Sequence, residues 1–435
     1  MANQSQGSSR ISVTLRRAAR TAPVLAAALG LSMVSARPAQ AQTLTPLYSF
    51  MGGTDGANPS GNLLMAAGNL YSTTNYGGDL SCSVLVGIPG CGVAFGVSAS
   101  GKETVLHAFT GNADGADPIV GLAALAGNGY GVTANGGAFG SGTVFKINGR
   151  TGKETVVYTF TGGADGGNPN GTLTSDRAGN LYGTAQYGGD LSCHYFGSPG
   201  CGVVFKFNPA TGVETVLYTF TGPPDGDVPS AGLLRDPAGN LYGTTADGGA
   251  SANCGAGVGC GTVFELNTSL KETVLLSFDY AHGAHPFGGL IADKAGYVYG
   301  NTVSGGPFGL GTVFKLGNTG ETVLFNFDGG ADGADPTGSL LLDPAGNLYG
   351  TNEIGGDLNC AVTGLAGCGV VFKLDTMTAT LTPMWSFTGG ADGAQPGGGL
   401  IRDGAGAFYG VTFYGGNPAC HNGGTGCGVV FKLIQ

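Results

Sequence analysis

The amino-acid sequence predicts an all-β protein, a seven-bladed β-propeller in which each blade has four strands. Glycine and proline supply 87 and 20 of the 435 residues, as expected of a chain with many tight turns. Charged residues make up 11%, against roughly 25% in an average soluble domain, which argues against a helical protein with a charged surface. A unit of about 56 residues also recurs seven times, a period typical of propellers and solenoids.

Two other glycine-rich classes are excluded by the composition. Glycine does not occupy every third position, as collagen requires. Hydrophobic residues make up 42% and aromatic residues 9%, which is more than disordered chains usually contain.

Aromatic residues at equivalent positions mark the seven units. One Phe closes a strand-like run before each long loop, at Phe50, Phe109, Phe160, Phe220, Phe278, Phe327 and Phe387. A second lies in each run similar to "GTVFKL" or "GVVFKL", at Phe95, Phe145, Phe205, Phe264, Phe314, Phe372 and Phe431. Each unit has a Pro, an "AGNLYG"-like phrase and a Gly-Gly pair between these two markers. Because the Phe and Tyr recur in every unit at strand positions, we expect them in the core rather than in sugar-stacking platforms.

Each unit contains four short runs rich in β-branched and aromatic residues, bounded by turn residues. In the third unit we predict strands over Gly171–Ser175, Asn180–Thr184, Gly202–Phe207 and Glu214–Phe220. The "DPAGN" phrase, Asp236–Asn240 in the next unit, predicts a tight turn between the first two strands. An open β-solenoid is the alternative architecture.

The two ends of the repeat predict how the ring closes. Leu44–Phe50 matches the fourth strand of a unit, and the chain stops at Gln435 directly after a third strand. We therefore expect the N-terminal strand to complete the last blade, which removes an exposed sheet edge.

Residues 1–41 have the pattern of a signal peptide, with basic residues, an apolar stretch and Ala39-Gln40-Ala41. Arg16-Arg17 would suit twin-arginine export, although its surroundings fit poorly. This segment holds five Arg and no acid, so its removal changes the net charge from −10 to −15. We expect 42–435 to form one domain, secreted or periplasmic and monomeric, without a membrane span. An acidic surface repels phosphates, so nucleic acid binding is not expected.

The unit, "ETVLYTFTGGADGANPxGxLxxDxAGNLYGTTxxGGxxxxGTVFKL", resembles the Gloeo-Verruco tandem repeat of the choice-of-anchor family of exported bacterial proteins. The resemblance extends over 44–435 and implies export, without a defined reaction. Members often end in an anchoring segment. This chain shows none, which implies a secreted or periplasmic protein.

Ten cysteines form five sequence-local pairs, each between the Gly-Gly pair and the third strand. The pairs are Cys82/Cys91, Cys193/Cys201, Cys254/Cys260, Cys360/Cys368 and Cys420/Cys427. Units two and five lack both members of the pair, which favours local disulfides in an exported protein. Metal binding is the alternative, but the gaps are too long for a zinc site.

The loop between the second and third strands and the connection to the next blade lie at the same end of each blade. We call this end the Cys-loop face. Loop aspartates there, at Asp114/Asp117 and Asp332/Asp335, predict either a Ca²⁺ site or turns in which each Asp bonds its own backbone. No other cofactor is evident.

Three residues depart from the repeat near this face and are the candidate catalytic or metal-binding residues. His282 and His285 replace loop Asx residues in unit five, and Glu353 in unit six falls where other units carry residues such as Ala or Val. Sequence drift in a tolerant loop is the alternative. We expect these residues to approach one another across the face.

The sequence favours a non-catalytic binding module whose Cys-loop face contacts a glycan, a peptide or another envelope partner. The alternative functions are a propeller enzyme, such as a polysaccharide lyase, a glycoside hydrolase or a lactonase-like hydrolase, and a purely structural surface protein.

Overall fold

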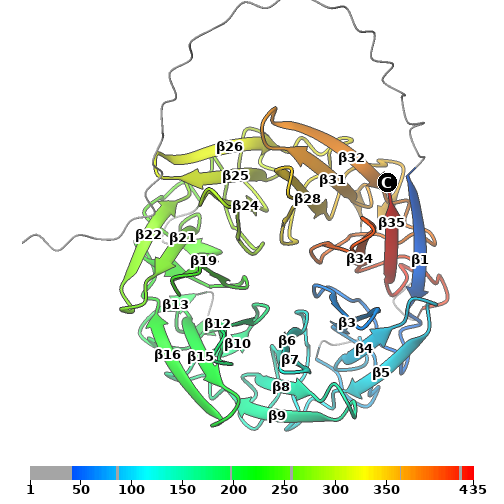
Figure 1. Ribbon diagram of the computed structural model, residues 1–435, viewed down its shortest axis with the longest axis horizontal. Helices are drawn as coiled ribbons and strands as arrows, with labels where there is room; N and C mark the ends of the chain where they lie inside the picture. Colours follow the sequence, from blue (N-terminus) through cyan, green and yellow to red (C-terminus); the bar gives the residue numbers. More distant parts are fainter. Residues whose placement is uncertain (1–41, 85–87, 196–197, 255–257, 363, 421–423) are drawn as a thin grey trace, which may run out of the picture.

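The computed structural model describes residues 42–435 except 85–87, 196–197, 255–257, 363 and 421–423. Seven four-stranded antiparallel sheets form a closed ring around a central channel (Figure 1). No helix occurs within these residues, so none of them forms a helix able to cross a membrane. The predicted signal peptide, 1–41, lies outside the described residues.

The strands of each blade follow one another in sequence order, the first nearest the channel and the fourth at the rim (Figure 1). The first three blades contain β2 (Leu64–Ala66), β3 (Asn69–Thr74), β4 (Val93–Val97) and β5 (Glu103–Ala108); β6 (Ala123–Leu125), β7 (Asn128–Thr133), β8 (Thr143–Ile147) and β9 (Glu154–Thr159); β11 (Thr174–Ser175), β12 (Leu181–Tyr187), β15 (Val203–Asn208) and β16 (Val213–Thr219).

The next three contain β18 (Leu234–Arg235), β19 (Leu241–Thr245), β21 (Thr262–Leu266) and β22 (Glu272–Ser277); β23 (Ile291–Ala292), β24 (Val298–Thr302), β25 (Thr312–Gly317) and β26 (Gly320–Asn326); β27 (Leu341–Leu342), β28 (Asn347–Asn352), β31 (Val370–Asp375) and β32 (Thr380–Ser386). Short pairs add β10 (Gly167–Pro169) to β12, and join β13 (His194–Tyr195) to β14 (Ser198–Pro199), β17 (Gly226–Asp227) to β20 (Asp247–Gly248) and β29 (Ala361–Val362) to β30 (Leu365–Ala366).

The seventh blade closes the ring as predicted and excludes the open solenoid. It contains β33 (Ile401–Arg402), β34 (Phe408–Thr412), β35 (Val429–Ile434) and β1 (Thr43–Ser49), in that order from the channel outward. Strand β1 pairs antiparallel with β35, from Thr43 opposite Ile434 to Ser49 opposite Val429 (Figure 1).

The innermost strands are shorter than predicted. In the third blade only Thr174–Ser175 of the expected Gly171–Ser175 is strand. The reason is the packing of Gly171, where an added Cβ would lie 2.5 Å from the backbone oxygen of Ala231 in the next blade. The segment before each inner strand therefore packs against its neighbour around the channel rather than pairing with its own sheet.

Phenylalanine rings fill the space within and between the blades. The ring centroids of Phe109 and Phe145 lie 5.0 Å apart in an edge-to-face arrangement, and both residues are fully buried. A Cβ at Gly131 on strand β7 would lie 2.4 Å from Cζ of Phe145. The last glycine of the "AGNLYG" phrase, present in six of the seven units, leaves space for this ring of the third strand, and the first unit has the small residue Ser72 instead.

One backbone hydrogen bond joins each blade to the one before it. Its donors are the residues that precede the loop prolines, each with φ between 52° and 59°: Asn58, Asp117, Asn168, Val228, His285, Asp335 and Gln395. Their N–H groups donate to the carbonyl oxygens of Cys427, Cys91, Ser141, Cys201, Cys260, Leu310 and Cys368. Asn and Asp tolerate this left-handed conformation better than most residues, which accounts for their frequency here.

Deleting Thr43–Ser49 should destabilise the protein, because β35 then loses its partner and becomes an exposed sheet edge. We expect Tm to fall by roughly 10 °C or more, or the protein to form oligomers through the free edge. Thermal unfolding and size-exclusion chromatography would compare this variant with a chain that begins at Gln42. An unchanged Tm in a monomeric deletion variant would rule out a stabilising role for closure.

Candidate functional site

Five disulfides join the predicted cysteine pairs, and the described residues contain no free cysteine. The paired Cα atoms lie 5.1–5.8 Å apart, within the usual range. The disulfides also connect the loops of the Cys-loop face, since a Cβ at Gly111 in the following loop would lie 2.3 Å from Sγ of Cys82. In units two and five, Ser141 and Leu310 take the place of the second cysteine.

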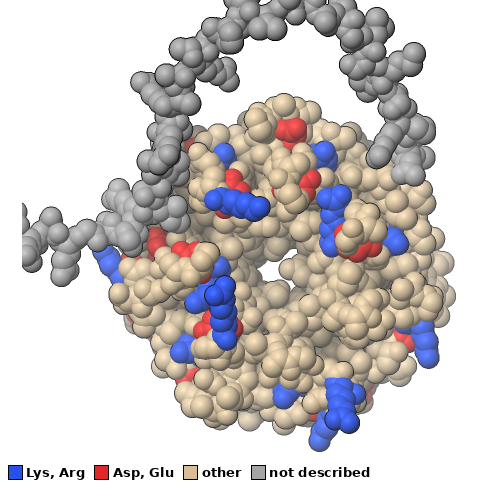
Figure 2. Space-filling model, viewed as in Figure 1, with Lys and Arg blue, Asp and Glu red and all other residues tan. Residues whose placement is uncertain are grey.

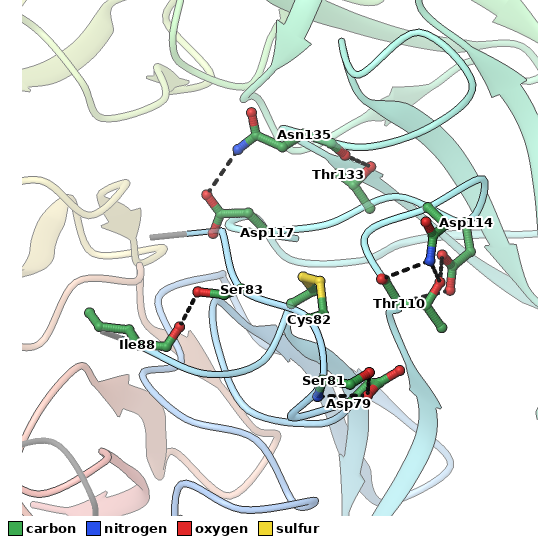
Figure 3. The surroundings of a disulfide bond; sticks show 12 residues. Asp79, Ser81, Cys82, Ser83, Ile88, Thr110, Asp114, Asp117, Thr133 and Asn135 are labelled. Atoms are coloured by element: carbon green, nitrogen blue, oxygen red, sulfur yellow. Dashed lines mark hydrogen bonds between the residues drawn. A yellow bond between two sulfur atoms is a disulfide. The ribbon is translucent and has the colours of Figure 1, made fainter. Parts of the chain in front are cut away.

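Of the four loop aspartates predicted as calcium ligands, Asp114, Asp117 and Asp332 accept hydrogen bonds from the protein through their carboxylates. Asp114 accepts hydrogen bonds from the N–H and hydroxyl of Thr110, at 3.0 and 2.5 Å. Asp117 instead points toward the Asn135 amide, 3.4 Å away, so the two carboxylates face apart (Figure 3). Burial raises the pKa of Asp117 to about 6.

Asp332 and Asp335 occupy the same positions in the loop before the sixth blade. Asp332 accepts a hydrogen bond from the backbone N–H of Asp328, and the backbone N–H of Asp335 donates to Leu310. Calcium binding at these residues stays an untested prediction. Within the described residues the one close group of three ligand-type side chains is Cys193, Cys201 and Asp227, and its cysteines form a disulfide.

The two histidines of unit five have different surroundings. His282 is exposed, and its Nδ1 lies 2.9 Å from Oδ1 of Asp279, which raises the pKa of the imidazole. His285 Nδ1 lies 3.0 Å from the carbonyl oxygen of Ala246 and 3.1 Å from Oδ1 of Asp247. His285 therefore makes the inter-blade contact that Asn168 makes through its amide to Ala134. Neither histidine lines the cavity that contains Glu353.

A pair of buried carboxylates lies next to His285, one of which contacts its imidazole. Asp227 and Asp247 face each other across the bridge between β17 and β20, and their exposed fractions are 4% and 3%. Burial and the charge of Asp247 raise the pKa of Asp227 to about 7. The sequence analysis did not identify Asp247. A signal was present, because the equivalent bridges of the other units, such as Ala57↔Tyr76 and Ala116↔Asn135, contain no acid, whereas this unit has two.

A second set of carboxylates lies between the outer strands, near the start of the fourth strand of five blades. The residues are Glu103, Glu154, Glu214, Glu272 and Glu321. Each has a pKa raised to about 7, mainly because burial disfavours the charged form. In all five a nearby loop aspartate adds to the shift, as Asp165 does for Glu214.

The channel contains a polar cavity of about 310 Å³ lined by residues from all seven blades. Two sets of positions supply most of its side chains. The residue after each loop proline is Ser60, Ile119, Asn170, Ser230, Phe287, Thr337 or Gly397, and the ends of three second strands add Asn75, Glu353 and Phe413. Second strands run toward the Cys-loop face, so the cavity lies toward that end of the channel. Figure 2 shows the central opening, with charged side chains in separate groups around it.

Glu353 supplies the one carboxylate among the residues that line this cavity. Its Oε1 accepts a hydrogen bond of 2.8 Å from the hydroxyl of Thr337, and burial together with the charge of Asp335 raises its pKa. The sequence marked Glu353 as an outlier but not Phe287 or Asn170. Their position in the repeat could have identified these two residues. The residue after the loop proline differs between units, and only Ser occurs there twice.

The outer glutamates should make the protein less stable as pH rises from about 5 to 8. The unfolded chain loses these protons near roughly pH 4.3, whereas the folded protein loses them near pH 7, so the folded state binds more protons in between. We expect Tm to fall across this range and the fall to be smaller in Glu154→Gln. Differential scanning calorimetry at each pH would test this, with Glu265→Gln on β21 as the control. A Tm that rises with pH would contradict the expectation.

Replacing Asp227 by Ala, the residue found at this bridge in most units, should raise Tm, and should raise it more at pH 8 than at pH 5. The reason is that Asp227 ionises near pH 7 and then places a second buried charge beside Asp247. Asp225→Ala is the matched control and should lower Tm at both pH values, because Asp225 accepts bonds from Tyr218 and Thr221. Destabilisation by Asp227→Ala at pH 8 would show that the carboxylate has a structural partner.

Comparison with solved structures reveals a similar fold in extracellular proteins. The extracellular domain described as that of a hybrid two component system from B. thetaiotaomicron is 11% identical, with 89% of this chain and 41% of that chain covered and a TM-score of 0.53. The extracellular domain of a one component system from the same organism is 12% identical, with 86% and 38% covered and a TM-score of 0.50. This chain thus spans about two fifths of each. A gluconolactonase from Xanthomonas campestris is 14% identical, with 67% and 78% covered and a TM-score of 0.39.

At these identities, the two extracellular domains show likeness of fold alone. No curated protein matches the chain. The Gloeobacter/Verrucomicrobia repeat, in contrast, matches residues 33–196, 84–258, 192–363 and 251–434, which together span nearly the whole sequence. The chain belongs to the Gloeobacter/Verrucomicrobia repeat family.

Proposed function

We propose that this protein is an exported, monomeric, non-catalytic binding module that holds the end of a hydrophilic ligand in its central cavity. The ligand would be a glycan, a peptide or another envelope polymer that enters from the Cys-loop face. Export is supported by the five disulfides, by the family resemblance and by the pattern of residues 1–41.

The observation that carries this proposal is the loss of repeat symmetry at the cavity. A proline lies at the same position in all seven units, yet the next residue is hydroxyl, amide, aliphatic, aromatic or glycine. The strand residues that form the core change far less between units. Variation at a concave, polar surface is expected where side chains select a ligand.

The chemistry of the lining supports binding rather than hydrolysis. Glycoside hydrolysis commonly uses two carboxyl groups on opposite sides of the scissile bond. The described lining offers one, Glu353, and it is already bonded to Thr337. At about 310 Å³ the cavity is at the lower end of the range for ligand pockets, which suits one end group rather than a whole polymer.

Binding should be lost when the cavity is filled. A glycan array and pull-down of isolated envelope polymers with the 42–435 chain would identify ligands, and Asn170→Trp should weaken each of them about tenfold or more, because the indole takes the ligand's place.

Met377→Trp is the matched control, since Met377 is 90% exposed in the turn between β31 and β32 at the opposite end of the blade. Binding that survives Asn170→Trp would place the site elsewhere. Chemical turnover of a bound ligand would show that the protein is an enzyme.

A further inference from the structure

Resting on the proposed function, we infer that the group bound at Glu353 is a protonated amine on a hydroxyl-rich ring, so that the ligand ends in an amino sugar. The inference comes from one arc of the cavity, in which a carboxylate lies between two aromatic residues, and from the amide-rich wall contributed by other blades.

The carboxylate of Glu353 has no positive partner in its surroundings. Among the described residues that line the cavity there is no Lys, Arg or His. The charged and titratable groups that act on Glu353 or are acted on by it are Asp335, whose charge disfavours ionisation, and Tyr414, whose pKa is raised in part by Glu353. Burial also raises the pKa of Glu353 itself. A cation that entered the cavity would therefore stabilise the ionised form of Glu353, which burial and Asp335 disfavour.

The space beside the carboxylate is open because the neighbouring blade has glycine there. A Cβ built on Gly397 would lie 3.9 Å from Oε1 of Glu353. Six other units carry a side chain at this position, so Gly397 leaves room for a ligand group next to the acid.

Two aromatic side chains line the same arc. Phe287 comes from the fifth blade, Glu353 from the sixth and Phe413 from the seventh. Phe287 is 41% exposed, although it is a large apolar residue in a polar cavity. Aromatic faces attract ammonium groups and stack against the apolar faces of sugar rings.

The remaining wall suits hydroxyl groups. Asn62 and Asn75 each use the side-chain oxygen to accept a hydrogen bond, from the N–H of Gly399 at 2.6 Å and from the hydroxyl of Ser60 at 2.7 Å. Their NH₂ groups remain as donors for ligand oxygens. Asn170 and Thr172 of the third blade add further polar groups to the lining.

These features separate the amino sugar from related ligands. A neutral sugar would cover the carboxylate without pairing it, and an acidic sugar would add a like charge, and both are unfavourable in a partly buried site. A protonated amino sugar supplies the counter-charge and the hydroxyls together.

Calorimetric titration with two oligosaccharides of equal length, fully deacetylated chitosan and chitin, would test the inference. The two differ only in having an ammonium or an acetamide at each ring. We expect the 42–435 chain to bind the chitosan oligosaccharide at least about tenfold more tightly at pH 6, with affinity that falls as salt is added.

Glu353→Gln keeps the shape and an acceptor for Thr337 but removes the charge, so it should abolish this preference. Glu321→Gln, which removes a carboxylate at the rim, should leave it unchanged. Gly397→Leu, at a position without positive φ, should weaken chitosan binding about tenfold by filling the space while the charge remains. It tests the inference independently if Glu353→Gln fails to fold.

Equal affinity for the two oligosaccharides, a preference that survives Glu353→Gln, or no binding of either would overturn the amino-sugar inference. The proposed function fails by a different result, namely that the ligands found in the screen still bind to Asn170→Trp.

Discussion

The contact on which the ring depends is made where a loop proline lies against a glycine of the preceding blade. A Cβ on Gly92 would lie 2.6 Å from Cδ of Pro118, and one on Gly428 would lie 2.6 Å from Cδ of Pro59. Directly beside this contact, the residue before the proline donates its N–H across the same seam. The proline–glycine contact and the hydrogen bond beside it both require two backbones to approach closely and residues to adopt an unusual φ. This requirement explains the high glycine and proline content of the repeat.

Most of the fold could be predicted from the sequence because its signals are local and are repeated seven times. Strand order, closure by β1 and the cysteine pairs follow from the register of one unit against the next. The inner strands were predicted too long, because the run around Gly171 has strand-like composition but packs across the channel. The convergence expected for His282, His285 and Glu353 is absent from the cavity lining, since His285 bonds across a blade seam and His282 lies in an exposed loop.

The cavity could be predicted only in part. Glu353 stood out as a departure from the repeat, yet Thr337, Phe287 and Gly397 come from other segments and gain meaning only when the ring brings them beside it. Asp247 is a similar case, because two strands, β18 and β19, separate it in sequence from its partner Asp227. In a repeat protein, the sequence alone therefore identifies residues that depart from the repeat. The residues that surround them in space become apparent only in the folded ring.

Closure by β1 also has a consequence for synthesis. The ribosome makes this strand before the blades, and it makes the partner strand β35 after the strands of the first six blades. Each blade from the first to the sixth can pair its own strands as they emerge, but β1 stays without its partner until β35 has been made. Every product that ends before β35, whether from a truncated message or from early proteolysis, therefore keeps an open ring with unpaired strand edges. Quality-control proteases and chaperones that recognise such edges would distinguish it from the finished ring.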